Sequence, residues 1–275
     1  MNEIEALVLG IVQGLTEYLP VSSSGHLVVA SSFMDVKDPD ENLTFAVLVH
    51  AATALSSIII FRKAIGSILR DLIQFRWNSG TQYVAMLAAA ALPVVIVGLT
   101  FEAELSALFE GNVALVGAMW LVTGALLLFT LYVKKHDRRL NFQNTFIIGI
   151  AQAIAVLPGI SRSGATIATA LLMKIDKAEA ARFSFLVVIV PILGKAALDL
   201  KDLLGGEAAA SGAASGLSTG VALIGFSAAF VTGLAACQAM LSIVKRGKLH
   251  YFSIYCFALG ILALLIGTNV ISFGA

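Results

Sequence analysis

The sequence predicts an all-α polytopic membrane protein with six transmembrane helices and two re-entrant helix–loop–helix pairs, arranged as an inverted-topology repeat. Of the 275 residues, 59% are hydrophobic and only 13% are charged, whereas a soluble domain carries roughly 25% charged residues. Long apolar runs alternate with short charged loops, which is typical of membrane-spanning helices. Two of the apolar stretches are interrupted by a proline followed by small polar residues. The net charge of +1, without a basic stripe, argues against nucleic-acid binding.

The predicted elements follow one another in two similar series. Each span approaches the roughly 20 apolar residues that cross a bilayer as a helix. The first series is a broken stretch over 4–34 and spans over 44–61, 83–100 and 113–133. The second is a broken stretch over 142–173 and spans over 183–200, 217–244 and 251–273.

The charges of the loops indicate how the broken stretches lie. Lys and Arg gather in the loops over 62–76, 134–141, 174–182 and 245–250, which the positive-inside rule places in the cytoplasm. All four loops share one side only if 142–173 enters and leaves the membrane on that side, and the same reasoning makes 4–34 enter and leave from outside. Non-helical backbone at membrane depth must be buried in protein or line a wet cavity. The two breaks are therefore candidates for one site.

The two broken stretches also resemble each other, as LGIVQGLTEYLPVSSSGH and IGIAQAIAVLPGISRSGA. Gln13 and Gln152 stand 139 positions apart, as do Ser22 and Ser161. We therefore predict two repeats, over 1–139 and 140–275, within one membrane domain. Each repeat has three spans, an odd number, so the second is inverted relative to the first, as in many transporters.

Breaks that enter from opposite faces would bring polar side chains together inside the membrane, where ionisable groups mark functional sites. Arg162 is always charged and offers a planar fork of donors suited to phosphate or carboxylate. Nearby serines, glycines and helix N-termini offer N–H groups to an anion. A simpler alternative is an Arg162–Glu17 ion pair that only joins the hairpins. The residues predicted to bind phosphate are Ser22, Ser24, Gly25, Ser161, Ser163, Gly164 and Thr166.

Several roles stay open at this point. Glu17 shares a helix face with Gln13 four residues earlier, and it either holds a divalent cation, alone or with Gln13, or acts as a base. Ser23 or Ser22 is either a nucleophile, activated by the histidine at position 26, or a hydrogen-bond donor to the anion. His50, in the middle of a span, either lines the same cavity or packs between helices.

Taken together, these motifs are familiar. GxxQGLTEYLPVSSSGH followed by PGISRSGAT, with ARFSF at 181–185, resembles the undecaprenyl-pyrophosphate phosphatases of bacteria, the bacitracin-resistance family, over the whole chain. Members of that family are integral membrane enzymes that remove the terminal phosphate from the C55 lipid carrier pyrophosphate, which recycles the carrier for cell-wall synthesis. The resemblance implies catalytic roles for Glu17, His26 and Arg162, with Ser23 beside the phosphates.

The resemblance also implies a need for Mg²⁺ or Ca²⁺ and a site open to the periplasm. Gln13 stands where some members carry a second glutamate, which weakens a metal site built on two carboxylates. Ala46 stands where many relatives have an acidic residue, so no role transfers to that position.

We therefore expect a phosphatase of the bacterial inner membrane whose catalytic set is Glu17, His26, Arg162 and Ser23. Its partners would be the polyprenyl pyrophosphate substrate and membrane lipid, with a homodimer left open. The rival interpretation is a transporter or flippase of a polyprenyl phosphate or another anion, because inverted repeats and broken helices are transporter architecture.

Overall fold

The computed structural model describes residues 1–33, 39–108, 112–205, 217–268 and 270. Within these residues the secondary structure is helical, apart from one isolated bridge between Arg138 and Ile175. The predicted all-α class is confirmed. Position 34 of the first broken stretch and most positions after 268 in the last span lie outside the described residues.

Each predicted broken stretch is a pair of short helices on either side of a break. The first pair is α1 (Glu3–Tyr18) and α2 (Ser23–Phe33), and the second is α8 (Phe142–Ile154) and α9 (Arg162–Leu172). Each helix is shorter than the roughly 20 residues needed to cross a bilayer.

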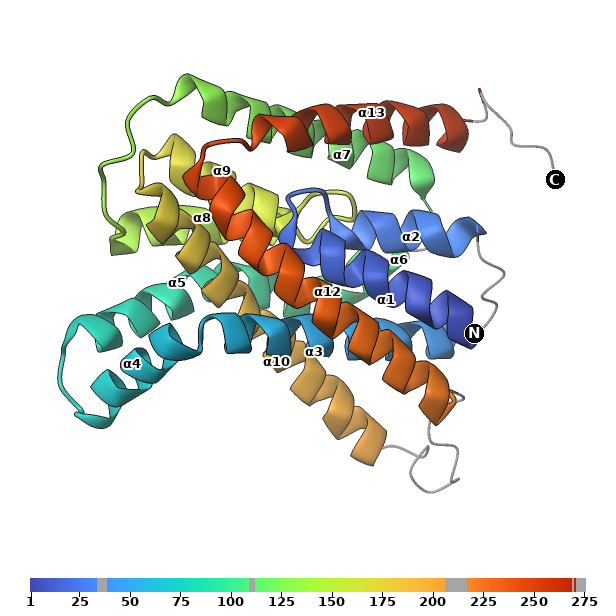
Figure 1. Ribbon diagram of the computed structural model, residues 1–275, viewed down its shortest axis with the longest axis horizontal. Coiled ribbons are helices and arrows are strands. Elements are labelled where there is room, and N and C mark those ends of the chain that lie inside the picture. The colour runs from blue at the N-terminus through green and yellow to red at the C-terminus, as the bar shows by residue number, and fades with distance from the viewer. Residues whose placement is uncertain (34–38, 109–111, 206–216, 269, 271–275) are drawn as a thin grey trace.

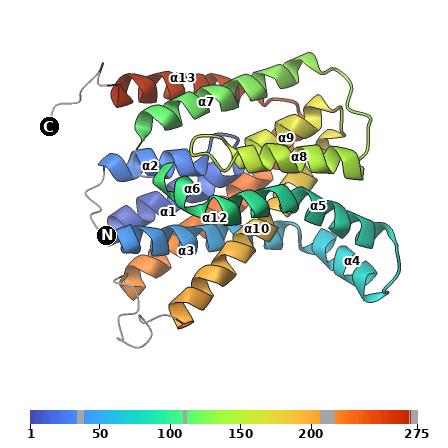
Figure 2. The same cartoon turned by 180° about the vertical axis from the view of Figure 1, so that it is seen from behind.

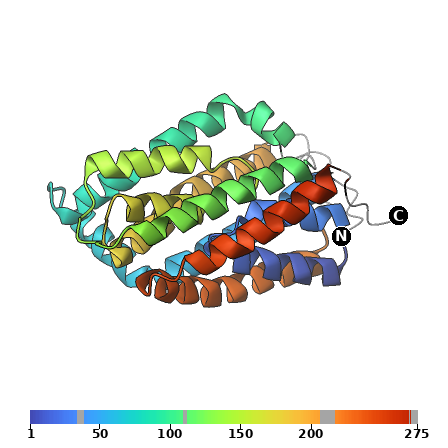
Figure 3. The ribbon, with the colours of Figure 1, turned by 90° about the horizontal axis from the view of Figure 1, so that it is seen from above.

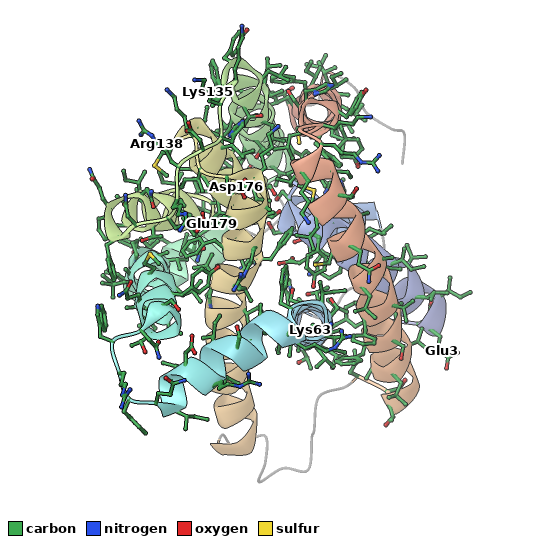
Figure 4. The ribbon with its side chains drawn as sticks, turned by 60° about the vertical axis from the view of Figure 1, so that its left-hand side comes forward. Glu3, Lys63, Lys135, Arg138, Asp176 and Glu179 are labelled. Atoms are coloured by element: carbon green, nitrogen blue, oxygen red, sulfur yellow. The ribbon has the colours of Figure 1, made fainter. Side chains whose placement is uncertain are left out.

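Backbone hydrogen bonds at the ends of the second pair show that it returns to the side from which it started. The N–H of Arg138, before α8, donates to the carbonyl of Lys174, after α9, at 3.0 Å, and Asp176 N–H donates back to Arg138 at 3.0 Å. Figure 4 shows the labelled Lys135, Arg138, Asp176 and Glu179 on one side of the protein and Glu3 on the other. In Figure 1 the connections α4–α5, α7–α8 and α12–α13 lie at one end, and both termini lie at the other.

The longer helices surround the two pairs. They are α3 (Pro39–Ile60), α5 (Ser79–Thr100), α7 (Val113–Phe129), α10 (Lys177–Gly205), α12 (Thr219–Lys245) and α13 (His250–Gly267). Among the described residues, α5, α7 with the following turn η1 (Thr130–Tyr132), α12 and α13 are long and apolar enough to cross a membrane. Residues 44–60 of α3 reach that length only together with α4 (Arg62–Ile73), which bends away by 77°. A multi-pass membrane protein is therefore established, and the count of six spans stays a prediction.

The order of the layers places the two breaks at the centre. Helices α7 and α13 pack side by side along one edge, α1 packs on α12, and α8 packs on α5. The view from behind shows α8 against α5 (Figure 2), and the view from above shows α7 beside α13 (Figure 3). A short helix, α6 (Glu102–Leu108), lies within the loop that follows α5.

The contacts between the breaks are reciprocal. A Cβ added to Gly25 would lie 3.2 Å from Cα of Gly159, and one added to Gly164 would lie 3.2 Å from Cβ of Pro20. If each residue is replaced by the residue 139 positions away in the other repeat, the contact of Gly25 with Gly159 becomes the contact of Gly164 with Pro20. Pro20 therefore corresponds to Gly159 rather than to the neighbouring proline. This reciprocity is what an inverted repeat would produce, and the division into 1–139 and 140–275 stays a prediction.

Candidate active site

The two breaks are joined to each other and to α7 by hydrogen bonds. The hydroxyl of Ser163 donates to the carbonyl of Leu19 at 3.3 Å, directly from one break to the other. Trp120 of α7 donates from its indole N–H to Val21 at 2.7 Å. Thr123, one turn later, donates to the Gly159 carbonyl at 3.2 Å and accepts from the Ser161 N–H at 3.2 Å. Because one helix binds both breaks, their relative position is fixed.

Both breaks end in the same capping arrangement. Ser22 accepts from the N–H of Gly25 at 3.2 Å, and Ser161 accepts from the N–H of Gly164 at 3.0 Å. The capping hydroxyls also lie 3.2 Å from those of Ser24 and Ser163, respectively. Serine is a preferred N-cap because its oxygen satisfies an N–H that has no partner within the helix.

The caps change which groups are available to an anion. The amides of Gly25 and Gly164, predicted to contact phosphate, donate to serines in this structure. The first two amides of α9, those of Arg162 and Ser163, have no acceptor among the described residues, and helix N-terminal amides of this kind bind anions. Thr166, also predicted at the phosphate, is buried and donates to the Arg162 carbonyl at 2.9 Å.

Glu17, near the C-terminal end of α1, is the centre of the polar cluster. Its Oε1 accepts from Nη2 of Arg162 at 3.2 Å, which links the two breaks. Its Oε2 accepts from Nε2 of Gln13 at 2.9 Å and from Oγ of Ser23 at 2.6 Å. The Glu17 side chain is 7% exposed and that of Arg162 is 27% exposed. The structure thus brings together three members of the predicted catalytic set, Glu17, Ser23 and Arg162.

A small cavity lies beside this polar cluster, and it is lined by both polar and apolar residues. Glu17, Arg162 and Ser163 line one part, and apolar residues of α10, including Phe185, line another. Tyr18 also lines it, and its hydroxyl lies 2.8 Å from the hydroxyl of Ser57 on α3. The cavity, of about 20 Å³, has room for about one water molecule and marks where polar and apolar walls meet beside Glu17.

His26, the fourth predicted catalytic residue, is directed elsewhere. Its Nδ1 lies 2.7 Å from the carbonyl of Ser22, and its Nε2 lies 2.8 Å from the hydroxyl of Tyr255 on α13. Both ring nitrogens are thus engaged away from Glu17 and Arg162. The cause is local, because the carbonyl of Ser22, which directly precedes α2, binds the ring.

The imidazole that faces the carboxylate instead belongs to His50 of α3. Its Nε2 lies 3.7 Å from Oε2 of Glu17, and its Nδ1 lies 2.7 Å from the carbonyl of Ala46. Of the two alternatives for His50, the structure favours a place at the site. The signal in the sequence was an ionisable residue in the middle of an apolar span.

The site offers few ligands to a metal ion. Among the described residues no three His, Cys, Asp or Glu side chains form a group that could hold one. Oε1 of Gln13 is buried without a hydrogen-bond partner in the described part of the chain, and its amide is bonded to Glu17. Mg²⁺ is commonly held by one or two carboxylates together with substrate phosphates, and Glu17 supplies one such carboxylate, with the Gln13 oxygen as a further candidate ligand.

Comparison with known proteins gives a consistent result over nearly the whole chain. The family described as bacitracin resistance protein BacA matches residues 6–262. A protein of Christiangramia forsetii named undecaprenyl-diphosphatase is 49% identical over 268 residues, which cover 96% of this chain and 98% of the relative. Proteins of the same name from Bacteroides fragilis strain YCH46 and Carboxydothermus hydrogenoformans are 48% and 38% identical, each over 97% of this chain and 98% of the relative.

Proposed function

The chain belongs to the bacitracin resistance protein BacA family, and from this membership we infer that it is an undecaprenyl-diphosphatase. It is a membrane enzyme that hydrolyses the phosphoanhydride of undecaprenyl diphosphate to undecaprenyl phosphate and inorganic phosphate. This reaction recycles the cell-wall lipid carrier and underlies bacitracin resistance. The relatives carry the name of an enzyme, and nothing in the comparisons favours a transporter.

The observation that carries the proposed site is the contact of Arg162 with Glu17 across the two breaks, at 3.2 Å. A guanidinium and the first amides of α9 together form a cradle for an oxyanion. We propose that the diphosphate binds here, with Arg162 and the hydroxyls around it neutralising charge in a loose phosphoryl-transfer transition state. The proposed phosphate ligands remain Ser22, Ser24, Gly25, Ser161, Ser163, Gly164 and Thr166, of which the two glycines would have to release their amides from the capping serines.

The proton of Ser23 has an acceptor already in place. Oγ of Ser23 donates to Oε2 of Glu17 at 2.6 Å, so Glu17 can take this proton as Oγ attacks the terminal phosphorus. A bond from Oγ to phosphorus forms, the phosphoanhydride bond breaks, and undecaprenyl phosphate leaves. Water then releases phosphate from the serine. In the alternative, Glu17 and Ser23 orient a water that attacks directly. His26 is proposed as the residue that returns a proton, for which its Nε2 would have to exchange the Tyr255 hydroxyl for a group of the substrate.

Glu17, alone or with Oε1 of Gln13, is the proposed contact for Mg²⁺ or Ca²⁺. Bound with the substrate, such an ion would offset the charge of the diphosphate. The fit rests on the unpartnered Gln13 oxygen, and the residues described above act on the substrate whichever ion is present.

We propose that the enzyme resides in the bacterial inner membrane with its site open to the periplasm or cell exterior. Support comes from the basic loops, which share one end of the molecule opposite the termini (Figure 1). The polyprenyl tail would remain in lipid along the apolar helices.

The test is phosphate release from undecaprenyl diphosphate by the purified protein in detergent, where micelles have no compartments and transport gives no signal. Ser23→Ala should lower kcat by about 10³-fold if Oγ is the nucleophile, in line with the loss of one member of a concerted catalytic group. Ser67→Ala, on α4, removes a hydroxyl that donates only to its own helix at Ala64, and it should leave kcat unchanged. Absence of phosphate release by the wild-type protein would refute the assignment.

A further inference from the structure

The last helix of the chain reaches the first break through Tyr255. Its hydroxyl lies 2.8 Å from Nε2 of His26, 229 positions earlier in the sequence. The two rings are stacked, with centroids 5.8 Å apart and planes at 5°. Trp120 of α7 also contacts the imidazole in an edge-to-face arrangement, with ring centroids 5.1 Å apart. His26 is thus held by one aromatic ring on α13 and another on α7.

The hydrogen bonds of His26 fix which nitrogen carries its proton. A carbonyl oxygen only accepts, so Nδ1, 2.7 Å from the Ser22 carbonyl, carries hydrogen. In a neutral imidazole the other nitrogen is then an acceptor, and the Tyr255 hydroxyl donates to it. Nε2 therefore keeps its lone pair, which accepts the Tyr255 hydroxyl in this structure and can take up a proton once that hydrogen bond is exchanged.

Tyr255 sits on a part of α13 that is anchored to the break itself. The next residue, Cys256, directs its thiol to the carbonyl of Pro20 at 3.6 Å, and both cysteine and proline are buried. Ser253 donates to the carbonyl of Gly124 on α7 at 2.8 Å. These contacts hold the Tyr255 backbone in register with the first turn of α2. A hydroxyl held in this way restricts rotation of the imidazole as well as its tautomer.

We propose that Tyr255 is a positioning residue for the phosphatase reaction, which holds His26 in the Nδ1–H tautomer with its ring orientation fixed. The proposal rests on the proposed function, in which His26 handles a proton. Tyr255 acts through His26 and has no assigned contact with substrate. Without its hydroxyl, the imidazole would sample both neutral tautomers and rotate about its side chain.

The test compares Tyr255→Phe with Tyr251→Phe in full-length protein in detergent. Tyr255→Phe keeps the stacked ring and removes only the hydroxyl, and it should lower kcat about tenfold with KM unchanged, the scale of one neutral hydrogen bond. Tyr251 is one turn earlier on the same helix, 59% exposed, with its ring against His250, and its substitution should leave kcat within about twofold of the wild type, as expected for an exposed position.

Nitrogen NMR of histidine-labelled protein gives the second readout. In the wild type, the His26 signals should report hydrogen on Nδ1 and a hydrogen-bonded lone pair on Nε2. In Tyr255→Phe they should move toward a mixture of the two tautomers, and Tyr251→Phe should leave them in place. Unchanged His26 signals in Tyr255→Phe, or an unchanged kcat, would overturn the proposal. An inactive wild type would refute the proposed function, and the NMR signals would still decide whether Tyr255 fixes His26.

Discussion

The most informative experiment on this site distinguishes the structural role of the Arg162–Glu17 ion pair from its role in catalysis. At 3.2 Å, two unit charges in an effective dielectric of about 20 attract by about 5 kcal/mol. Arg162→Met would leave a carboxylate with a 7% exposed side chain without its strongest partner, and breaking a buried pair in this way costs about 3–5 kcal/mol. Because Gln13 and Ser23 still donate to the carboxylate, we expect the lower end, a free energy of unfolding reduced by about 3 kcal/mol.

The double variant Arg162→Met/Glu17→Gln distinguishes two hypotheses. In one the ion pair only holds the two hairpins together, and in the other it takes part in catalysis. The double variant removes both charges, so most of the lost stability should return, because a neutral pair of similar volume leaves no stranded ion. Phosphate release should stay at least about 10³-fold below the wild type, because both the anion ligand and the proton acceptor are absent. Stability is measured by thermal unfolding in detergent and activity by phosphate release from undecaprenyl diphosphate.

Arg182→Met is the matched control for this experiment. Arg182 is an exposed guanidinium on α10 whose charge lies 5.2 Å from the ring of Tyr83, and its loss should leave phosphate release unchanged. Recovery of phosphate release in the double variant would refute the reasoning, because the pair would then only join the hairpins. If Arg162→Met alone were as stable as the wild type, the carboxylate would not depend on the guanidinium for its burial.

Four further predictions concern other polar side chains and the metal ion. Gln13→Met should lower phosphate release about tenfold, because it removes the bond to Glu17, roughly 1.4 kcal/mol. Gln152→Met should leave activity unchanged and stability equal or higher in thermal unfolding, because the Gln152 amide is buried without a partner among the described residues and replacing it removes an unsatisfied group. His50→Ala should lower kcat about threefold to tenfold, and His50→Gln should recover part of the loss. If kcat of His50→Ala equalled that of the wild type, this imidazole would have no role at the site. Treatment with EDTA should abolish phosphate release and added Mg²⁺ should restore it, whereas activity that persists in EDTA would contradict a metal contact at Glu17.

The sequence was sufficient to predict the helical hairpins because their signals are local. A proline and a capping serine end one helix and begin the next, and both breaks lie where these residues stand. The approach of Arg162 to Glu17 was also predictable, because a buried charge needs a partner and the repeat offered one. Helix α4 begins at Arg62 and ends at Ile73 within the predicted basic loop, since Phe75 adopts a positive φ of 48° and Asn78 caps the next helix.

The orientations of the His26 and His50 rings could not be predicted from the sequence. Whether His26 or His50 faces Glu17 depends on side-chain rotation and on Tyr255, a residue 229 positions away. No periodicity encodes such a contact. The carbonyls of Ser22 and Ala46, each four residues before its histidine, bind the two rings, and only the packing of α2 and α3 against their neighbours decides where the other nitrogen points.

The pairing of Glu17 with Arg162 spans 145 positions, and this has a consequence during biosynthesis. A nascent chain that has delivered only its amino-terminal hairpin to the bilayer carries an acid with no guanidinium opposite it. Lipid diphosphate therefore meets a competent enzyme only after the ribosome has passed the second hairpin and the translocon has inserted it. On the proposed site, hydrolysis therefore requires a chain that extends at least to the end of α9 at Leu172, of 275 residues in all, and products truncated before Arg162 lack the guanidinium.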